Sequence, residues 1–171
     1  MSQGGLAAVP ADETAVAAAE AARDAHEAGI VADLTQAPES PTDYKLPAPP
    51  MGAEPLAAEN ITLVREIAHE AGFTVGEFRS VASALYAFGW MPEGLQADVR
   101  IQKMQANKMG AELERRYGED RADTMARAAV GVIEGARAKA PQVATALRHM
   151  IVTNRPLLEM LARVGERHAR R

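Results

Sequence analysis

The side chains able to do chemistry are few and scattered in this sequence of 171 residues. Glu66 and His69 form an E-x-x-H pair, the half-motif that di-iron helical bundles need twice, together with two further glutamates. The sequence holds no second E-x-x-H, so a solvated helix face is the better interpretation. The other histidines lie far apart, no serine lies in a G-x-S-x-G elbow, and there is no cysteine. We therefore expect no catalytic residue, no metal ligand, no cofactor and no enzyme.

The composition favours helices over strands. Alanine, glutamate, arginine, leucine and methionine dominate, and the alternation of β-branched and aromatic residues that is typical of strands is missing. Only 3 Phe, 3 Tyr and 1 Trp supply large rings, so we do not expect a sizeable compact core. No apolar run is long enough to span a membrane, and acidic residues interrupt the N-terminal apolar runs. The sequence predicts an all-α, soluble, cytoplasmic protein without membrane contacts.

Charge is distributed unevenly along the chain. The formal net charge is −4, but residues 1 to 99 carry a net −11 and residues 100 to 171 a net +7. The chain is therefore an electrostatic dipole. Such asymmetry predicts either an acidic partner for the C-terminal part or antiparallel self-association of the two halves.

The chain begins with a predicted acidic arm, residues 1–56. Within it the sequence predicts an alanine-rich helix over residues 12–28, which has little to bury and orders fully only against a partner. A linker rich in proline follows over residues 35–55, where the missing N–H groups exclude regular helix. We interpret it as a tether, with docking of Tyr44 and Leu46 on a surface as the alternative.

A helical domain is predicted over residues 57–171, and it opens with a helical hairpin. The first helix is expected from Asn60, as N-cap, to Ala71, with Gly72 ending it. Thr74 and Glu77 then form a capping box, and Phe73 and Phe78 are spaced as a hydrophobic staple. This second helix is expected to end at Gly89.

One long central helix is predicted from Pro92 to Gly118. A mainly apolar stripe runs along it, with one residue at every third or fourth position from Leu95 to Tyr117. The helix is too long to be wholly buried in so small a protein. A second partial stripe is formed by Ile101, Met104 and Lys108. It indicates that two faces of the helix contact neighbours, and that one of these neighbours comes from another copy of the chain. Gly118 is expected to adopt a positive φ and to let the following helices fold back.

A C-terminal helical cluster completes the prediction. We expect a helix from Arg121 to Lys139, capped by Glu119 or Asp120, then one opened by Pro141, and a last one capped by Thr153 or Asn154. Gly131 and Gly135 lie four residues apart, a spacing that permits close helix approach. The run of arginines at the C-terminus favours contacts with an acidic surface; nucleic acid is the weaker alternative, because the run lacks interleaved aromatic residues and the pI is about 5.6.

Three segments follow one another in a recognisable order. Residues 112–129 carry a charged helix end, Tyr117-Gly118, two acidic residues and an alanine-rich helix. The segment Tyr44-Lys45-Leu46-Pro47 lies upstream, and residues 154–166 form a leucine-rich closing element with Asn-x-Pro and Ala-Arg-Val-Gly. This order resembles that of tailed-phage and prophage scaffolding-like proteins. The resemblance spans residues 43–166. It departs from the family pattern in having Tyr117 where tryptophan is usual, and in lacking long repeats rich in glutamine and glutamate. A scaffold, a decoration protein and an internal virion protein therefore stay open.

The resemblance implies a non-enzymatic capsid-assembly protein of the bacterial host cytoplasm, found inside or on the assembling virion. Its implied partners are the major capsid protein, or another virion protein, and further copies of itself. Trp90 lies between two predicted helices and is either a plug between them or an anchor for a partner. The residues we expect to bind partners are Tyr44, Leu46, Trp90, Tyr117, Arg155, Arg163, Arg167, Arg170 and Arg171.

Overall fold

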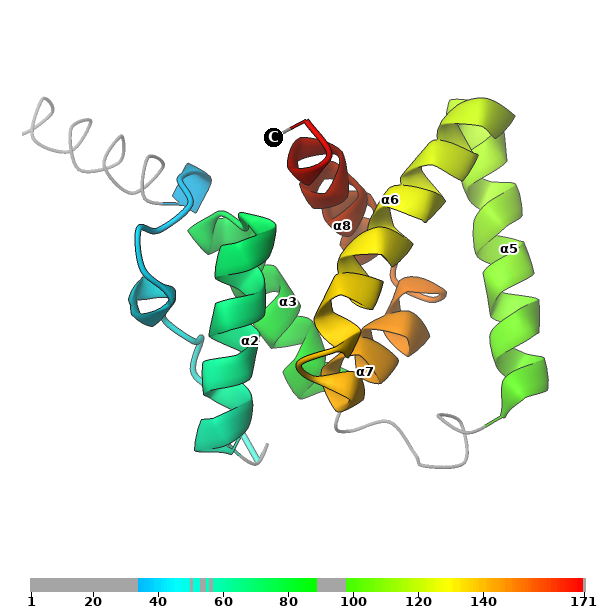
Figure 1. Ribbon diagram of the computed structural model, residues 1–171. Helices are drawn as coiled ribbons and strands as arrows, with labels where there is room; N and C mark the ends of the chain where they lie inside the picture. Colours follow the sequence, from blue (N-terminus) through cyan, green and yellow to red (C-terminus); the bar gives the residue numbers. More distant parts are fainter. Residues whose placement is uncertain (1–33, 50, 53–54, 56, 89–97, 171) are drawn as a thin grey trace, which may run out of the picture. The chain divides into compact units, whose positions relative to one another are not determined.

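The structure, a computed structural model, describes residues 34–49, 51–52, 55, 57–88 and 98–170. The chain divides into two compact units, Met1–Thr35 and Gln36–Arg171, and the second holds nearly all of the described residues. Every regular element among these residues is helical, which confirms the all-α fold (Figure 1). The helix predicted over residues 12–28 lies outside the described residues.

The predicted hairpin is formed by α2, Ala58–Ala71, and α3, Val75–Phe88. Gly72 ends α2 in the left-handed conformation, with φ 71°. The capping box is present: the Glu77 amide donates to the Thr74 hydroxyl at 3.2 Å, and the Thr74 amide donates to the Glu77 carboxylate at 2.9 Å. Phe73 and Phe78, the predicted staple pair, are both buried. Local capping chemistry therefore sets this turn, as the sequence indicated.

The start of α2 differs from the prediction. Ala57 occupies the N-cap position without a side-chain cap, and Asn60 lies inside the first turn. Asn60 instead accepts a hydrogen bond of 3.1 Å from Gln142, so its side chain connects two helices rather than capping one. Because Ala58 and Glu59 are good helix formers, the helix extends back past Asn60.

The long central helix is α5, Val99–Tyr117, and it begins later than predicted. Asp98 is its N-cap, with a carboxylate that accepts from the amides of Arg100 and Ile101 at 2.8 and 3.2 Å. A helix running unbroken from Pro92 is therefore wrong at residue 98, because an N-cap residue has extended backbone angles. Residues 89–97, including Trp90, lie outside the described residues.

Gly118 joins α5 to α6, Glu119–Arg137, and the two helices diverge from it (Figure 1). Its φ of 83° confirms the predicted positive φ, but its ψ of 158° places it outside the left-handed helical region. The predicted cap of α6 by Glu119 or Asp120 is wrong, because both residues lie in the first turn of the helix. Their negative charges there interact favourably with the helix dipole.

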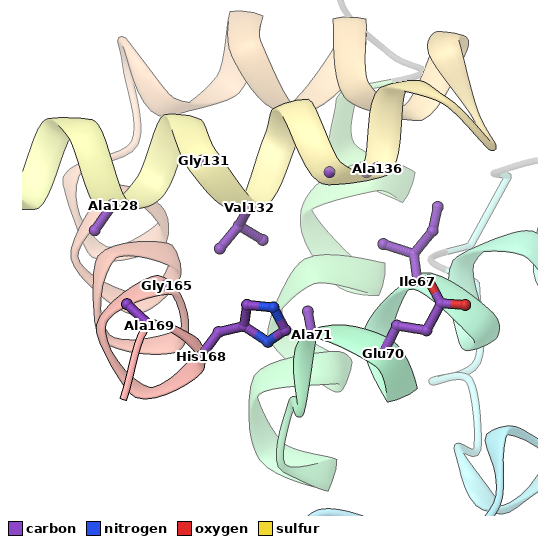
Figure 2. Close-up of a pocket in the computed structure, with 11 residues that line it drawn as sticks. Ile67, Glu70, Ala71, Ala128, Gly131, Val132, Ala136, Gly165, His168 and Ala169 are labelled. Carbon is purple, nitrogen blue, oxygen red and sulfur yellow. The ribbon is translucent and has the colours of Figure 1, made fainter. Parts of the chain in front are cut away.

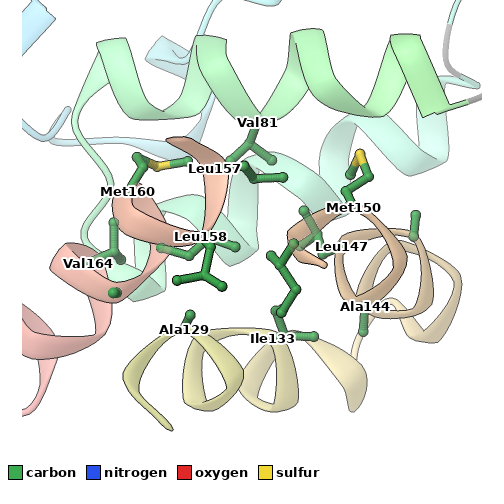
Figure 3. Packing of buried hydrophobic residues seen from close by; sticks show 14 of the residues in the cluster. Val81, Ala129, Ile133, Ala144, Leu147, Met150, Leu157, Leu158, Met160 and Val164 are labelled. Carbon is green, nitrogen blue, oxygen red and sulfur yellow. The ribbon is translucent and has the colours of Figure 1, made fainter. Parts of the chain in front are cut away.

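The C-terminal cluster consists of α6, α7, Pro141–Ile151, and α8, Arg155–His168. Pro141 opens α7 as predicted, and the Asn154 side chain caps α8 by accepting from the Leu157 amide at 3.1 Å. Side chains from α3, α6, α7 and α8 converge on one apolar centre (Figure 3).

This core is larger than the composition predicted. One continuous cluster of buried residues reaches from Tyr44 through α2, α3, α5, α6 and α7 to α8. Its interior is built mainly from alanine, leucine, methionine and valine rather than from rings. Small residues allow helix axes to approach closely, so a core poor in aromatic residues still excludes water.

The close approach lies at Gly165 and not at the predicted glycine pair. A Cβ atom on Gly165 would lie 2.4 Å from the Ala128 carbonyl oxygen, so α8 crosses α6 with backbone against backbone there. At Gly131 and Gly135 a Cβ atom would meet nothing within 4 Å. The small-x-x-x-small spacing therefore identified the correct helix, α6, but the wrong partner glycine.

The proline-rich segment is not a simple tether over its described part. Residues 36–49 lie on the helical unit, with the short 3-10 helix η1, Pro41–Asp43, against α2. Tyr44 is fully buried; its hydroxyl donates to the Phe73 carbonyl at 2.7 Å, and its ring lies 4.6 Å from that of Phe78. The structure thus supports the docking alternative, because one buried aromatic with a satisfied hydroxyl anchors the segment.

Candidate functional site

Two of the predicted partner-binding residues are part of the fold instead. Tyr44 has no exposed surface, and burial together with the nearby Glu77 carboxylate raises the pKa of Tyr44 to about 12. Leu46 is half-buried against the core. Arg65 donates from Nε to the Tyr44 carbonyl at 2.8 Å, which fixes the backbone here. Tyr44 therefore presents no free surface to a partner, and Leu46 presents only part of its side chain.

The arginines of the C-terminal helices are largely engaged in ion pairs. Arg167 donates to both carboxylate oxygens of Glu77, at 2.9 and 2.6 Å, and connects α8 to α3. Arg155 pairs with Glu112 of α5 and, at 3.3 Å, with Glu159. The pairs of Arg167 with Glu77 and of Arg155 with Glu112 join elements far apart in the sequence, so two of the predicted binding arginines hold helices together.

The Glu77–Arg167 pair changes the protonation of both groups. Burial alone would raise the pKa of Glu77, but hydrogen bonds from Arg167 and Thr74 outweigh it and hold the pKa below its ordinary value. The same hydrogen bond raises the pKa of Arg167. Both groups are therefore charged near neutral pH, and the pair joins the acidic half of the chain to the basic half within one molecule.

Arg163 and Arg170 are exposed on α8 and just after it, and neither makes an ion pair with another described residue. Arg171 and Trp90 lie outside the described residues. Tyr117 is 37% exposed; its hydroxyl donates to Glu159 at 2.9 Å, and the Arg116 guanidinium lies 5.6 Å from its ring centre. Of the predicted arginines that the structure describes, only Arg163 and Arg170 therefore stay exposed without an ion pair to another described residue.

A more coherent charged surface lies on α5. One of its faces carries six exposed residues at the spacing i, i+3, i+4, i+7, i+8 and i+11, and three of them are cations. We call this face the α5 stripe; it consists of Arg100, Lys103, Met104, Asn107, Lys108 and Ala111. No acidic residue occurs between Val99 and Ala111. The α5 stripe is therefore positive along its whole length.

The charges of the α5 stripe are not used within the described fold. Arg100, Lys103 and Lys108 make no ion pair with any other described residue. Met104 is 64% exposed, and the neighbouring Val99 is 74% exposed. Exposed cations beside exposed apolar side chains are suited to an acidic, partly apolar partner surface.

The sequence carries two signals for this surface. The predicted second stripe of Ile101, Met104 and Lys108 is one of them, although Ile101 is half-buried and lies at the edge of the exposed face. The stronger signal is that Val99 to Ala111 combine three Lys or Arg residues with no acidic residue, whereas α7, which also lacks acidic residues, carries only Arg148 of these two types.

A groove of about 270 Å³ lies between α2, α6 and α8 (Figure 2). His168 projects toward it from α8, and Glu70 at its edge is paired with Lys139 of the loop after α6. Most of its wall consists of small residues, namely Ala71, Ala128, Gly131, Gly135, Ala136 and Gly165. One imidazole and one paired carboxylate do not make a nucleophile with its base.

The histidine of the E-x-x-H pair in α2 contributes to structure. The His69 ring lies 3.0 Å from the Glu39 carbonyl oxygen, which ties α2 to the segment before η1. Among the described residues no group of three His, Asp or Glu side chains is placed to hold a metal ion. The helices of this part of the chain include none that is long and apolar enough to cross a membrane.

Comparison of the chain with protein-family models, with curated proteins and with solved structures gave no match.

Proposed function

We propose that this protein is a non-enzymatic assembly protein of the capsid-scaffold type, which acts by reversible contacts between exposed helical surfaces. The α5 stripe is the observation that supports the proposal most. It places three exposed cations, which make no ion pair with the described residues, beside exposed Met104 on the first half of a helix whose two buried residues, Met109 and Leu113, lie further along. Exposed charge pairs are individually weak and screened by salt, so contacts of this kind form and release easily.

The partners we propose are the major capsid protein or another virion protein, and further copies of this chain. Such a protein works in the cytoplasm of a bacterial host and is found inside or on the assembling virion. The electrostatic contact that the sequence assigned to the last helix moves in part to α5. Arg155 and Arg167 are engaged in ion pairs, whereas Arg100, Lys103 and Lys108 are exposed.

Co-expression with the major capsid protein encoded in the same genome tests this function. We expect closed, uniform shells when both proteins are present, and aberrant or open assemblies when the capsid protein is expressed alone. Electron microscopy and sedimentation distinguish these products. Identical particles with and without this chain would rule the function out.

Nucleic acid binding is the alternative that the α5 stripe also favours, because phosphates attract the same three cations. Against it, the α5 stripe contains no aromatic side chain to stack on bases, and the chain as a whole carries a net charge of −4. Binding to duplex DNA whose logarithm falls linearly with the logarithm of salt concentration would favour the alternative. No binding at low salt would remove it.

A further inference from the structure

The α5 stripe has a counterpart in the same sequence. The segment over residues 12–28 carries five acidic residues and only Arg23 as a cation, and most of its other residues are alanine. If it forms the helix that the sequence predicts, Glu13, Glu20, Asp24 and Glu27 share one face, because they are seven, four and three residues apart. This acidic face is opposite in charge to the α5 stripe, and both sets of charges lie along one face of a helix.

We infer that the α5 stripe binds the acidic segment, residues 12–28, of a second copy of this chain. This deepens the proposed function and rests on it, since it names one contact through which copies would associate. Glu13, Glu20 and Asp24 of one copy would face Arg100, Lys103 and Lys108 of the other. Alanine at most of the remaining positions would let the segment lie close over Met104, which is 64% exposed.

Two observations favour a second copy over another acidic protein or the same chain. The chain carries both complementary surfaces, so each copy offers one to each of two neighbours in a head-to-tail contact. Within the second unit, the described chain starts beside α2 and η1, and α6, α7 and α8 lie between them and α5 (Figure 1). The start of this unit therefore lies away from its own α5 stripe.

The contact would be electrostatic and salt-sensitive. Each exposed charge pair contributes little free energy by itself. Three or four pairs together change the dissociation constant of self-association by about 10-fold or more. Self-association should therefore be clear at low salt and weak at high salt. It should also depend on both surfaces equally.

Charge exchange on the full-length chain tests the inference. Variant A carries Arg100→Glu, Lys103→Glu and Lys108→Glu, and variant B carries Glu13→Lys, Glu20→Lys and Asp24→Lys. Light scattering and sedimentation should show that the original chain self-associates at low salt, and that each variant alone loses at least about 10-fold in affinity. An equimolar mixture of A and B should associate again, since each supplies the charges that the other requires.

Several outcomes would overturn the inference. Self-association of variant A at the original strength would show that the α5 stripe is not used. A monomeric original chain would point to docking within one chain, or to a different partner; DNA binding lost in variant A would then assign the α5 stripe to nucleic acid. If variant A does not fold, as judged by circular dichroism, Arg100→Gln, Lys103→Gln and Lys108→Gln test the same surface without added acidic charge.

These measurements need no capsid protein, so the two proposals fail separately. If the charge-exchange experiment contradicts the inference but shells assemble normally in co-expression, the proposed function stays in place. Intact self-association without any effect on shells would keep the inference and remove the scaffold function.

Discussion

α8 buries six of its fourteen residues, whereas α5 buries two of its nineteen, Met109 and Leu113. Both helices carry several cations. On α8, Arg155 and Arg167 pair with glutamates of other helices, while Arg100, Lys103 and Lys108 of α5 pair with no described residue. The positive charge of the C-terminal half therefore serves two purposes: it joins helices on α8, and it is presented outward on α5.

This difference predicts that α8 determines stability and α5 determines binding. Leu161→Ala, at a fully buried position of α8, should lower the free energy of unfolding by about 2–5 kcal/mol, because it leaves a cavity. Met104→Ala on α5 should change it by no more than about 0.5 kcal/mol. Urea unfolding followed by circular dichroism measures both. Equal losses in the two variants would contradict the division between the helices.

Two glycines at the contact between α6 and α8, Gly165 and Gly131, allow a close-packed position to be compared with an open one. Gly165→Ala places a Cβ atom against the Ala128 carbonyl and should lower the free energy of unfolding by about 1–3 kcal/mol, because the backbones must separate. Gly131→Ala is the matched control. It meets nothing, so it should stabilise the helix by about 0.5–1 kcal/mol. A neutral Gly165→Ala would mean that the two helices cross less closely than described.

Gly118→Ala tests the joint through which α5 leaves the core. At φ 83° and ψ 158° a side chain is strained, which should cost about 1–3 kcal/mol. Gly110→Ala, inside α5 and in open space, serves as the control without strain. We expect a lower melting temperature for Gly118→Ala only. Unchanged melting would show that the turn adopts another conformation.

The Glu77–Arg167 pair predicts a specific pH dependence. Because the pKa of Glu77 is lowered in the folded state, its contribution to stability is full above the ordinary glutamate pKa of about 4.3 and is lost as pH falls through the lower folded value. Glu77→Gln should therefore melt at a lower temperature than the original chain at pH 7, and the difference should shrink below about pH 4. A difference independent of pH would contradict an ionic origin.

The sequence predicted those parts of the fold that local chemistry determines. The Thr74–Glu77 capping box, the glycine at the end of α2, Pro141 at the start of α7 and the Asn154 cap are all found as predicted, since each depends on neighbours within a few residues. The all-α class follows from composition in the same way. Helix starts without a strong cap, as at α2 and α6, were misplaced by two residues.

Tertiary contacts account for what the sequence did not predict. Tyr44 looked like part of a tether because its partners, Phe73 and Phe78, are about thirty residues away in the sequence. Gly165 gave no local signal, because its constraint comes from the backbone of α6. For the same reason the sequence placed the candidate binding site on α8 rather than on α5. Only ion pairs between distant helices distinguish the engaged arginines of α8 from the exposed cations of α5.

Hydrogen exchange of the full chain at low and high protein concentration, in low salt, tests the central claim most directly. If the α5 stripe is the binding surface, amides of Val99 to Ala111 should become more protected as concentration rises, while those of α8 should be protected at every concentration. Variant A should lose the first effect and keep the second. Protection that rises in α8 but not in α5 would contradict the account.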